Sequence, residues 1–176
     1  MDEDNSFDLA ISLDHIKLVD TFFHINRPGT VDLQSKIAVT LPQIQKGVDI
    51  EARRIRVHAI ASIQFFLFGG EAPAELTSEN ASDAVVSFGA AMDVAASSPY
   101  VGPVIPVGKH SARSGLDVDD ERDRQIYDNI TLEILKSAYS FASARLLEVS
   151  GLSPFGAISM PLMDPDEMMD EIQKKL

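Results

Sequence analysis

The longest alternating run in the chain spans residues 48–68, with the sequence VDIEARRIRVHAIASIQFFLF. One face of this run is apolar over most of its length, through Ile55, Val57, Ala59, Ala61, Ile63, Phe65 and Leu67. A period of two predicts a β-strand, and the β-branched content disfavours a helix. The opposite face begins polar around Arg56 and ends apolar with Phe66 and Phe68. We therefore expect the end of this strand to pass under a second covering layer or into a subunit contact.

Residues 11–25 predict another strand, with a break in its phase. Leu13 has one parity in this segment, whereas Ile16 and Leu18 have the other. A change of phase within one strand indicates a β-bulge or a bend, which we place near His15.

Two further alternating segments, residues 31–41 and 84–94, predict two more strands. The first is typical of a half-buried antiparallel strand, with apolar residues on one face and polar residues on the other. Pro42 and Gly47 follow it and predict a turn before the long strand.

Residues 120–150 predict one long helix that ends at Gly151, since glycine readily takes the left-handed conformation that follows a helix. Its apolar side chains form two stripes. One consists of Tyr127, Ile130, Ile134, Ala138 and Phe141. The other consists of Leu132, Leu135, Tyr139, Ala142, Leu146 and Val149. A single sheet covers one stripe, so we expect the second to be an oligomer interface with a copy of the same helix.

A short C-terminal helix is predicted where Asp164 can act as N-cap and Pro165 as first helical residue. The elements together predict an α+β fold with a four-stranded antiparallel sheet, one long helix and one short C-terminal helix. At this length, residues 1–176 are expected to form a single domain. We expect residues 1–9 to be an acidic tail and residues 96–119 to be a Gly/Pro-rich crossover.

The net charge of −12, from 27 acidic and 15 basic residues, limits the classes of partner that the protein can bind. Nucleic acid and anionic membrane both require clustered Lys and Arg, so we expect neither as a partner. Basic partners, including unfolded basic polypeptides, would be attracted. The other reading of the charge is that it serves solubility alone. The chain has no cysteine, which excludes disulfides and thiolate zinc sites. Its acidic start, MDEDNSFD, is unlike a signal peptide, and we expect a bacterial cytoplasmic protein.

No constellation of residues predicts catalysis, so we expect neither an enzyme nor a cofactor. His15, His24, His58 and His110 share no spacing typical of a metal site, although His15 and His58 could meet across neighbouring strands. We therefore expect no metal. The acidic run at 117–124 lacks the internal glycine and closing glutamate of a calcium loop.

An excess of apolar side chains remains, most of it in residues 151–172, GLSPFGAISMPLMDPDEMMDEI. Prolines prevent this stretch from running as one helix or pairing as a central strand. Met and Phe together suit a surface that accepts varied apolar partners, and filling of the domain's own core is the open alternative. The candidate client-binding residues are Phe66, Phe68, Leu152, Phe155, Ile158, Met160, Leu162 and Met163.

The order of elements resembles that of the SecB family of protein-export chaperones, and three local patterns add to the resemblance. A pattern of the type basic-Ile-x-x-x-Asp-x-x-Phe is present at His15, Ile16, Asp20 and Phe23. A pattern of Gly-x-x-Pro, alternating apolar residues and a second proline is present at Gly151, Pro154, Ile158, Met160 and Pro161. A short amphipathic helix follows in both. In this chain the two prolines are one residue further apart than in the family pattern, and residues 96–119 have no close counterpart.

The resemblance implies an ATP-independent holdase chaperone, a homo-oligomer built as a dimer or a dimer of dimers. Unfolded polypeptide, either export-bound or an antitoxin-like client, would lie in a hydrophobic groove lined by the segment after the long helix. The family's zinc-binding C-terminal tail is not found in this sequence, so contact with the export motor ATPase stays open. The alternative is a non-catalytic interaction or regulatory module of the same fold. It would bind one specific folded partner, or a small ligand under Phe66, Phe68 and Phe155.

Overall fold

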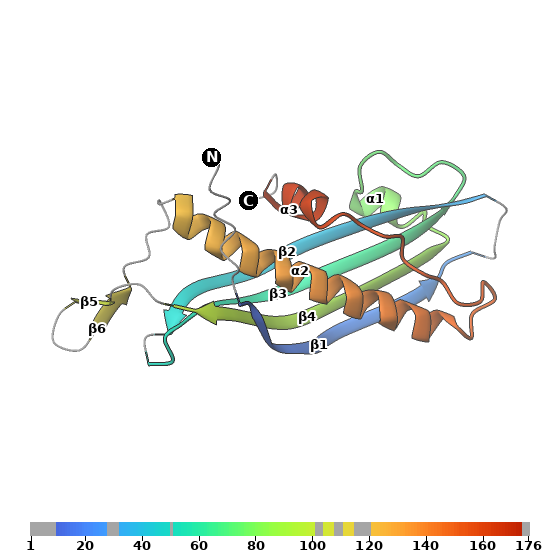
Figure 1. Ribbon diagram of the computed structural model, residues 1–176. Helices are drawn as coiled ribbons and strands as arrows, with labels where there is room; N and C mark the ends of the chain where they lie inside the picture. The colour runs from blue at the N-terminus through green and yellow to red at the C-terminus, as the bar shows by residue number, and fades with distance from the viewer. Residues whose placement is uncertain are drawn as a thin grey trace, which may run out of the picture.

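An antiparallel sheet of four strands forms the centre of the molecule (Figure 1). The strands are β1 (Ser12–Ile25), β2 (Leu33–Asp49), β3 (Arg54–Gly69) and β4 (Val86–Pro99). Their order across the sheet is β1-β4-β3-β2, so β1 and β2 are the two edge strands. With the helices described below, this confirms the predicted α+β fold.

The structure is a computed structural model that describes residues 10–27, 32–49, 51–100, 104–107, 111–114 and 121–173. Of residues 104–107, 111–114 and 121–123 it describes the backbone alone. The predicted acidic tail, residues 1–9, lies outside the described residues.

Three helices accompany the sheet: α1 (Ser78–Ala81), α2 (Glu121–Ser150) and α3 (Pro165–Gln173). Figure 1 shows α2 lying across one face of the sheet and α3 near β2. A backbone N–H donated by Asp166 to Asp164 Oδ1, at 2.9 Å, confirms Asp164 as the cap of α3. Within the predicted crossover, β5 (Val104–Val107) and β6 (Ser111–Ser114) pair as a separate two-stranded sheet. In the described part of the chain, no helix is long and apolar enough to span a bilayer.

The predicted turn between Pro42 and Gly47 is wrong. β2 continues through both residues to Asp49, and the chain turns at residues 51–53 instead. The pairing of β2 with β3 shifts register between Thr40 and Gln43. Such a bulge at an edge strand accommodates Pro42, which has no N–H to donate to the ladder.

The core lies between the sheet and α2. The apolar faces predicted for β3 and β4 both turn towards it, and Phe65 and Phe88 pair across the two strands and are fully buried. From α2, the first stripe supplies Tyr127, Ile130, Ile134 and Ala138 to the same core. Alternation of side chains along each strand explains why one face of the sheet carries nearly all of this packing.

β1 contains the predicted bulge. Leu13 pairs with Ala96 and His15 with Ala95, which leaves Asp14 as the extra residue. The bulge resets the alternation, so Ile16 packs against the core while His15 points to the opposite face of the sheet. A bulge that re-aims a side chain in this way is a common device near functional sites.

Most side chains in the second stripe of α2 are buried by other parts of the same chain. Leu135, Tyr139, Ala142 and Leu146 are buried, whereas Leu132 and Val149 are only half-buried. The chain returns along α2 after its end and contributes Met160 to the same core. The sequence-based argument that this stripe requires a copy of the helix is therefore wrong for the four buried residues. Oligomer formation itself stays a prediction.

The end of β3 does pass under a second layer, as predicted. Phe66 and Phe68 are buried together with Ala84, and Ala72, Leu76 and Ala81 pack against them. Lys36 Nζ donates to the carbonyl oxygen of Ala74 at 2.8 Å and helps hold this connection on the sheet. The connection between β3 and β4 thus forms a second, smaller core on the face away from α2.

Candidate functional site

Residues 151–164, which we call the linker segment, join α2 to α3 without forming a helix or a strand (Figure 1). Gly156 has a φ of 70°, in the left-handed region that glycine tolerates best, and it stands where the segment reverses. Prolines at 154 and 161 prevent a continuous helix.

Hydrogen bonds fix the linker segment to α2 at its middle and near its end. The backbone N–H of Ile158 donates to Ser150 Oγ at 2.8 Å, and Ser150 is fully buried. The hydroxyl of Tyr139 donates to the carbonyl oxygen of Pro161 at 2.6 Å. Because Met160 between these contacts is buried in the core, the backbone of the segment is held against the domain.

The apolar side chains of the linker segment divide into two groups. Met160 is buried, and Ile158 and Met163 pack partly against the core. Leu152 and Leu162 instead have exposed fractions of 101% and 103%. Phe155 is half-buried and does not belong to the core cluster. The candidate site on this segment therefore consists of Leu152, Phe155 and Leu162, which we call the linker surface.

Phe66 and Phe68 do not belong to the linker surface, contrary to our expectation for a client groove. Each has an exposed fraction of 6%, and they lie in the smaller core on the face away from α2. A ligand pocket shared by Phe66, Phe68 and Phe155 is therefore also wrong. The sequence showed correctly that this end of β3 is covered, but it could not show that the chain's own connection supplies the cover.

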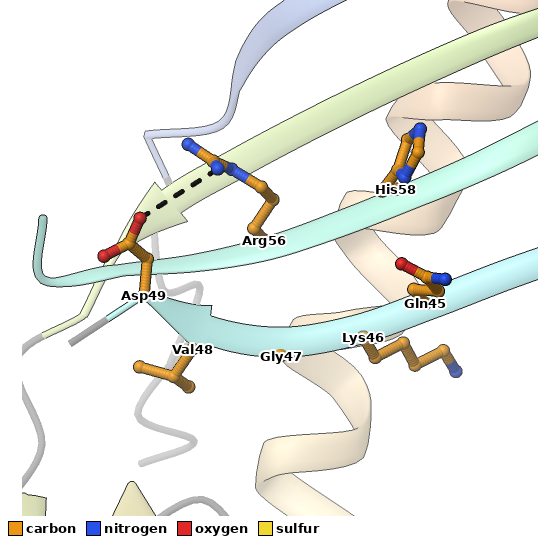
Figure 2. Close-up of a pocket in the computed structure, with 7 residues that line it drawn as sticks. All are labelled: Gln45, Lys46, Gly47, Val48, Asp49, Arg56 and His58. Carbon is orange, nitrogen blue, oxygen red and sulfur yellow. Dashed lines mark ion pairs between the residues drawn. The ribbon is translucent and has the colours of Figure 1, made fainter. Parts of the chain in front are cut away.

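A hollow of about 350 Å³ lies where β2 ends and β3 begins (Figure 2). It is lined by Gln45, Lys46, Gly47, Val48, Asp49, Arg56 and His58. Arg56 lies within 3.4 Å of Asp14 and 4.0 Å of Asp49. Lys46 Nζ lies 5.9 Å from the ring centroid of Tyr127. Because both basic side chains already have partners, this hollow offers little to an anionic ligand.

At the rim of this hollow, His58 belongs to a polar cluster with His15 and Asp93. From the sequence we expected only that the two histidines could meet. His15 Nε2 and His58 Nε2 lie 2.9 Å and 2.6 Å from the same oxygen, Asp93 Oδ1. These two hydrogen bonds, that of His15 first, hold the pKa of Asp93 below its ordinary value. Sequence reasoning missed Asp93. The available signal was a carboxylate on a strand face otherwise occupied by Ser87, Gly89, Ala91 and Ala95.

Comparison with known proteins gives likenesses among solved structures. No protein-family model matches the chain, and no curated protein matches it. Among solved structures, it is similar to the SecB-like chaperone Rv1957 of Mycobacterium tuberculosis, in complex with a ChAD peptide from the Rv1956 HigA1 antitoxin. The TM-score is 0.49 and the identity 11%, over 88% of this chain and 91% of that chain. A likeness of this size does not transfer a function.

Proposed function

We propose that the chain is an ATP-independent holdase that binds unfolded polypeptide through the linker surface. The observation that carries the proposal is the full exposure of Leu152 and Leu162 on a segment whose backbone is held by buried contacts. Scattered exposed leucines are ordinary on a protein surface. Two fully exposed leucines and a half-buried phenylalanine on one short segment concentrate apolar surface where a partner can cover it.

The energetics suit weak and unselective binding. Burying a leucine side chain contributes about 1.5–3 kcal/mol, from which the cost of ordering the client must be subtracted. The contacts are aliphatic and aromatic, so they set no demand on the sequence of the client beyond apolar residues. The net charge of −12 would favour basic clients through long-range attraction.

The eight predicted client-binding residues then take different roles. Leu152, Phe155 and Leu162 would contact the client, while Ile158 and Met163 would support the segment from below. Met160, Phe66 and Phe68 fill the interior. The proposal thus retains the predicted segment but moves the binding surface to its outward side chains.

We further propose that the active form is an oligomer. One linker surface offers only a few apolar side chains, so several copies acting on one unfolded chain would raise its apparent affinity by increasing the effective concentration of sites. The exposed Leu147 of α2 and the half-buried Leu132, about 60° apart around the helix, would lie at the contact between copies.

The proposal is tested by titrating the pure protein with a reduced and alkylated polypeptide that cannot fold. Size exclusion with light scattering gives the mass of the complex, and a fluorescent label on the polypeptide gives the affinity. A stable complex that is unaffected by ATP, and that forms with several unrelated unfolded chains but not with their folded forms, is the expected result. A protein that ignores every unfolded chain would overturn the proposal.

A further inference from the structure

The face of the sheet away from α2 brings two histidines together over a small residue. In the register of the sheet, His15 on β1 and His58 on β3 both pair with Ala95, which lies between them on β4. The side chain of Ala95 is too short to separate the two imidazole rings, whose centroids are 5.8 Å apart. The bulge at Asp14 is what turns His15 to this face, so the juxtaposition depends on the local irregularity of β1.

A carboxylate completes the cluster. Asp93 lies on the same face of β4, two residues from Ala95, and it accepts the Nε2 protons of both histidines. One ligand atom from each of the three side chains, a ring nitrogen of His15, a ring nitrogen of His58 and a carboxylate oxygen of Asp93, lies within 4.8 Å of the other two. The three side chains remain accessible to solvent, with exposed fractions of 49%, 41% and 32% for His15, His58 and Asp93.

The spacing of these atoms is close to that of a metal site and fits a small divalent ion after a small opening. Bonds of about 2.0–2.1 Å to a tetrahedral zinc ion place its ligand atoms about 3.3 Å apart. The observed separations of 2.6 Å and 2.9 Å between the nitrogens and the oxygen are shorter, so an ion requires a small opening of the cluster. Rotation of three partly exposed side chains provides such an opening without moving the strands. Binding of the ion would require the other tautomer of each neutral imidazole: its single proton would move from Nε2 to Nδ1, which leaves Nε2 free to bind the ion.

The charges around the cluster do not oppose a cation. Arg56, one of the basic side chains that line the hollow beside His58, forms ion pairs with Asp14 and Asp49. Lys17 stands opposite Asp93 in the register and is exposed, but the ion pairs described for Asp93 are those with His15 and His58. The carboxylate of Asp93 therefore interacts with the two imidazole rings rather than with a lysine or arginine.

We propose that His15, His58 and Asp93 form a binding site for a divalent transition metal ion of the zinc type, with water in its remaining positions. Two imidazole nitrogens exclude the hard ions Mg²⁺ and Ca²⁺, which require oxygen ligands. The absence of metal-site spacing in the sequence led us to expect no metal. The proposal departs from that expectation, because its ligands come from three strands. The bound ion would join the edge strand β1 to β3 across β4.

The test uses the full-length protein, stripped with a chelator and dialysed. Zn²⁺ is titrated by calorimetry, and Co²⁺ is used as a spectroscopic probe because its visible absorption reports the number and type of ligands. We expect one ion per chain. Replacing His58 by Gln or Asp93 by Asn should weaken binding by on the order of 100-fold. The matched control is His24→Gln, which removes an exposed histidine from the same face of β1 and should leave binding unchanged.

A second measurement does not depend on any variant. On addition of Zn²⁺ to the wild-type protein, the imidazole nitrogen resonances of His15 and His58 should shift while that of His24 does not. Hydrogen exchange at the backbone amides of β1 should also become slower. Binding that survives both His58→Gln and Asp93→Asn, or resonances of His15 and His58 that do not respond to zinc, would overturn the proposal.

Discussion

The hydroxyl of Tyr139, in the middle of α2, donates a hydrogen bond of 2.6 Å to the carbonyl oxygen of Pro161 in the linker segment. This bond holds the backbone beside Leu162, one of the two leucines that are fully exposed. Burial raises the pKa of the Tyr139 hydroxyl above its ordinary value of 10.0, because the phenolate would lose hydration there.

The raised pKa of Tyr139 predicts a loss of stability in alkali. Above the ordinary pKa, the unfolded chain has released the phenol proton while the folded chain retains it, so the free energy of unfolding falls as pH rises. Tyr139→Phe should cost about 1 kcal/mol near neutrality through the lost hydrogen bond. It should also show a shallower decline towards about pH 11. Urea unfolding at several pH values measures both effects; identical pH slopes would show that Tyr139 does not contribute to the alkaline loss.

Changing both exposed leucines to Asp should separate binding from folding. The double variant Leu152→Asp, Leu162→Asp should bind an unfolded polypeptide at least about tenfold more weakly, because it removes the burial of two leucine side chains. Its free energy of unfolding should stay within about 0.5 kcal/mol of the wild type, since both positions are on the surface. The double variant Leu13→Asp, Val19→Asp is the matched control, because it adds the same charge at two exposed apolar residues of β1 rather than of the linker segment. Equal losses of binding in both proteins would point to charge alone.

Met160, unlike the two exposed leucines, should contribute to the stability of the fold. Its exposed fraction is 7%, so Met160→Ala should lower the free energy of unfolding by about 2–5 kcal/mol. Leu162→Ala, two residues further along the same segment, should change it by less than about 0.5 kcal/mol. Thermal or urea unfolding of the two variants makes the comparison. If the two changes cost the same, the linker segment does not lie against the core in solution.

Gly89 should not tolerate a side chain. A Cβ added there would lie 2.3 Å from Cε1 of Phe22, so Gly89→Ala must displace the ring. We expect a loss of about 1–3 kcal/mol, the usual cost of overpacking. Gly47→Ala is the control, because a Cβ at that position meets nothing within 4 Å. Urea unfolding measures the stability of both variants. A Gly89→Ala protein as stable as the wild type would mean that Phe22 does not cover this strand.

The sequence predicted most of the sheet because alternation along a strand is a local property. The face of β3 that carries Phe65, the bulge next to His15 and the cap at Asp164 could all be read from neighbouring residues. The phase break between Leu13 and Ile16 was informative for the same reason. One strand that serves a single core cannot change parity without an extra residue.

The parts that could not be predicted depend on which distant segments meet. Pro42 and Gly47 resemble turn residues, but an edge strand tolerates both, so only the pairing with β3 shows that β2 continues. The linker segment, which has no periodicity, bonds to Tyr139 of the second stripe and adds Met160 to its core. Asp93 lacked any local signal of its partners, because His15 and His58 reach it from strands on either side.

The strand order β1-β4-β3-β2 has a consequence for how the chain is made. β2, β3 and β4 follow one another in the sequence and in the sheet, so they can assemble as they are synthesised. β1 is synthesised first, yet its only neighbour in the described sheet is β4, and it must wait until residues 86–99 have left the ribosome. Because the chain between β1 and β4 must close as a long loop before they pair, β1 joins the sheet late in folding. Of the four strands of this sheet, β1 is therefore the one that stays longest without its partner during synthesis.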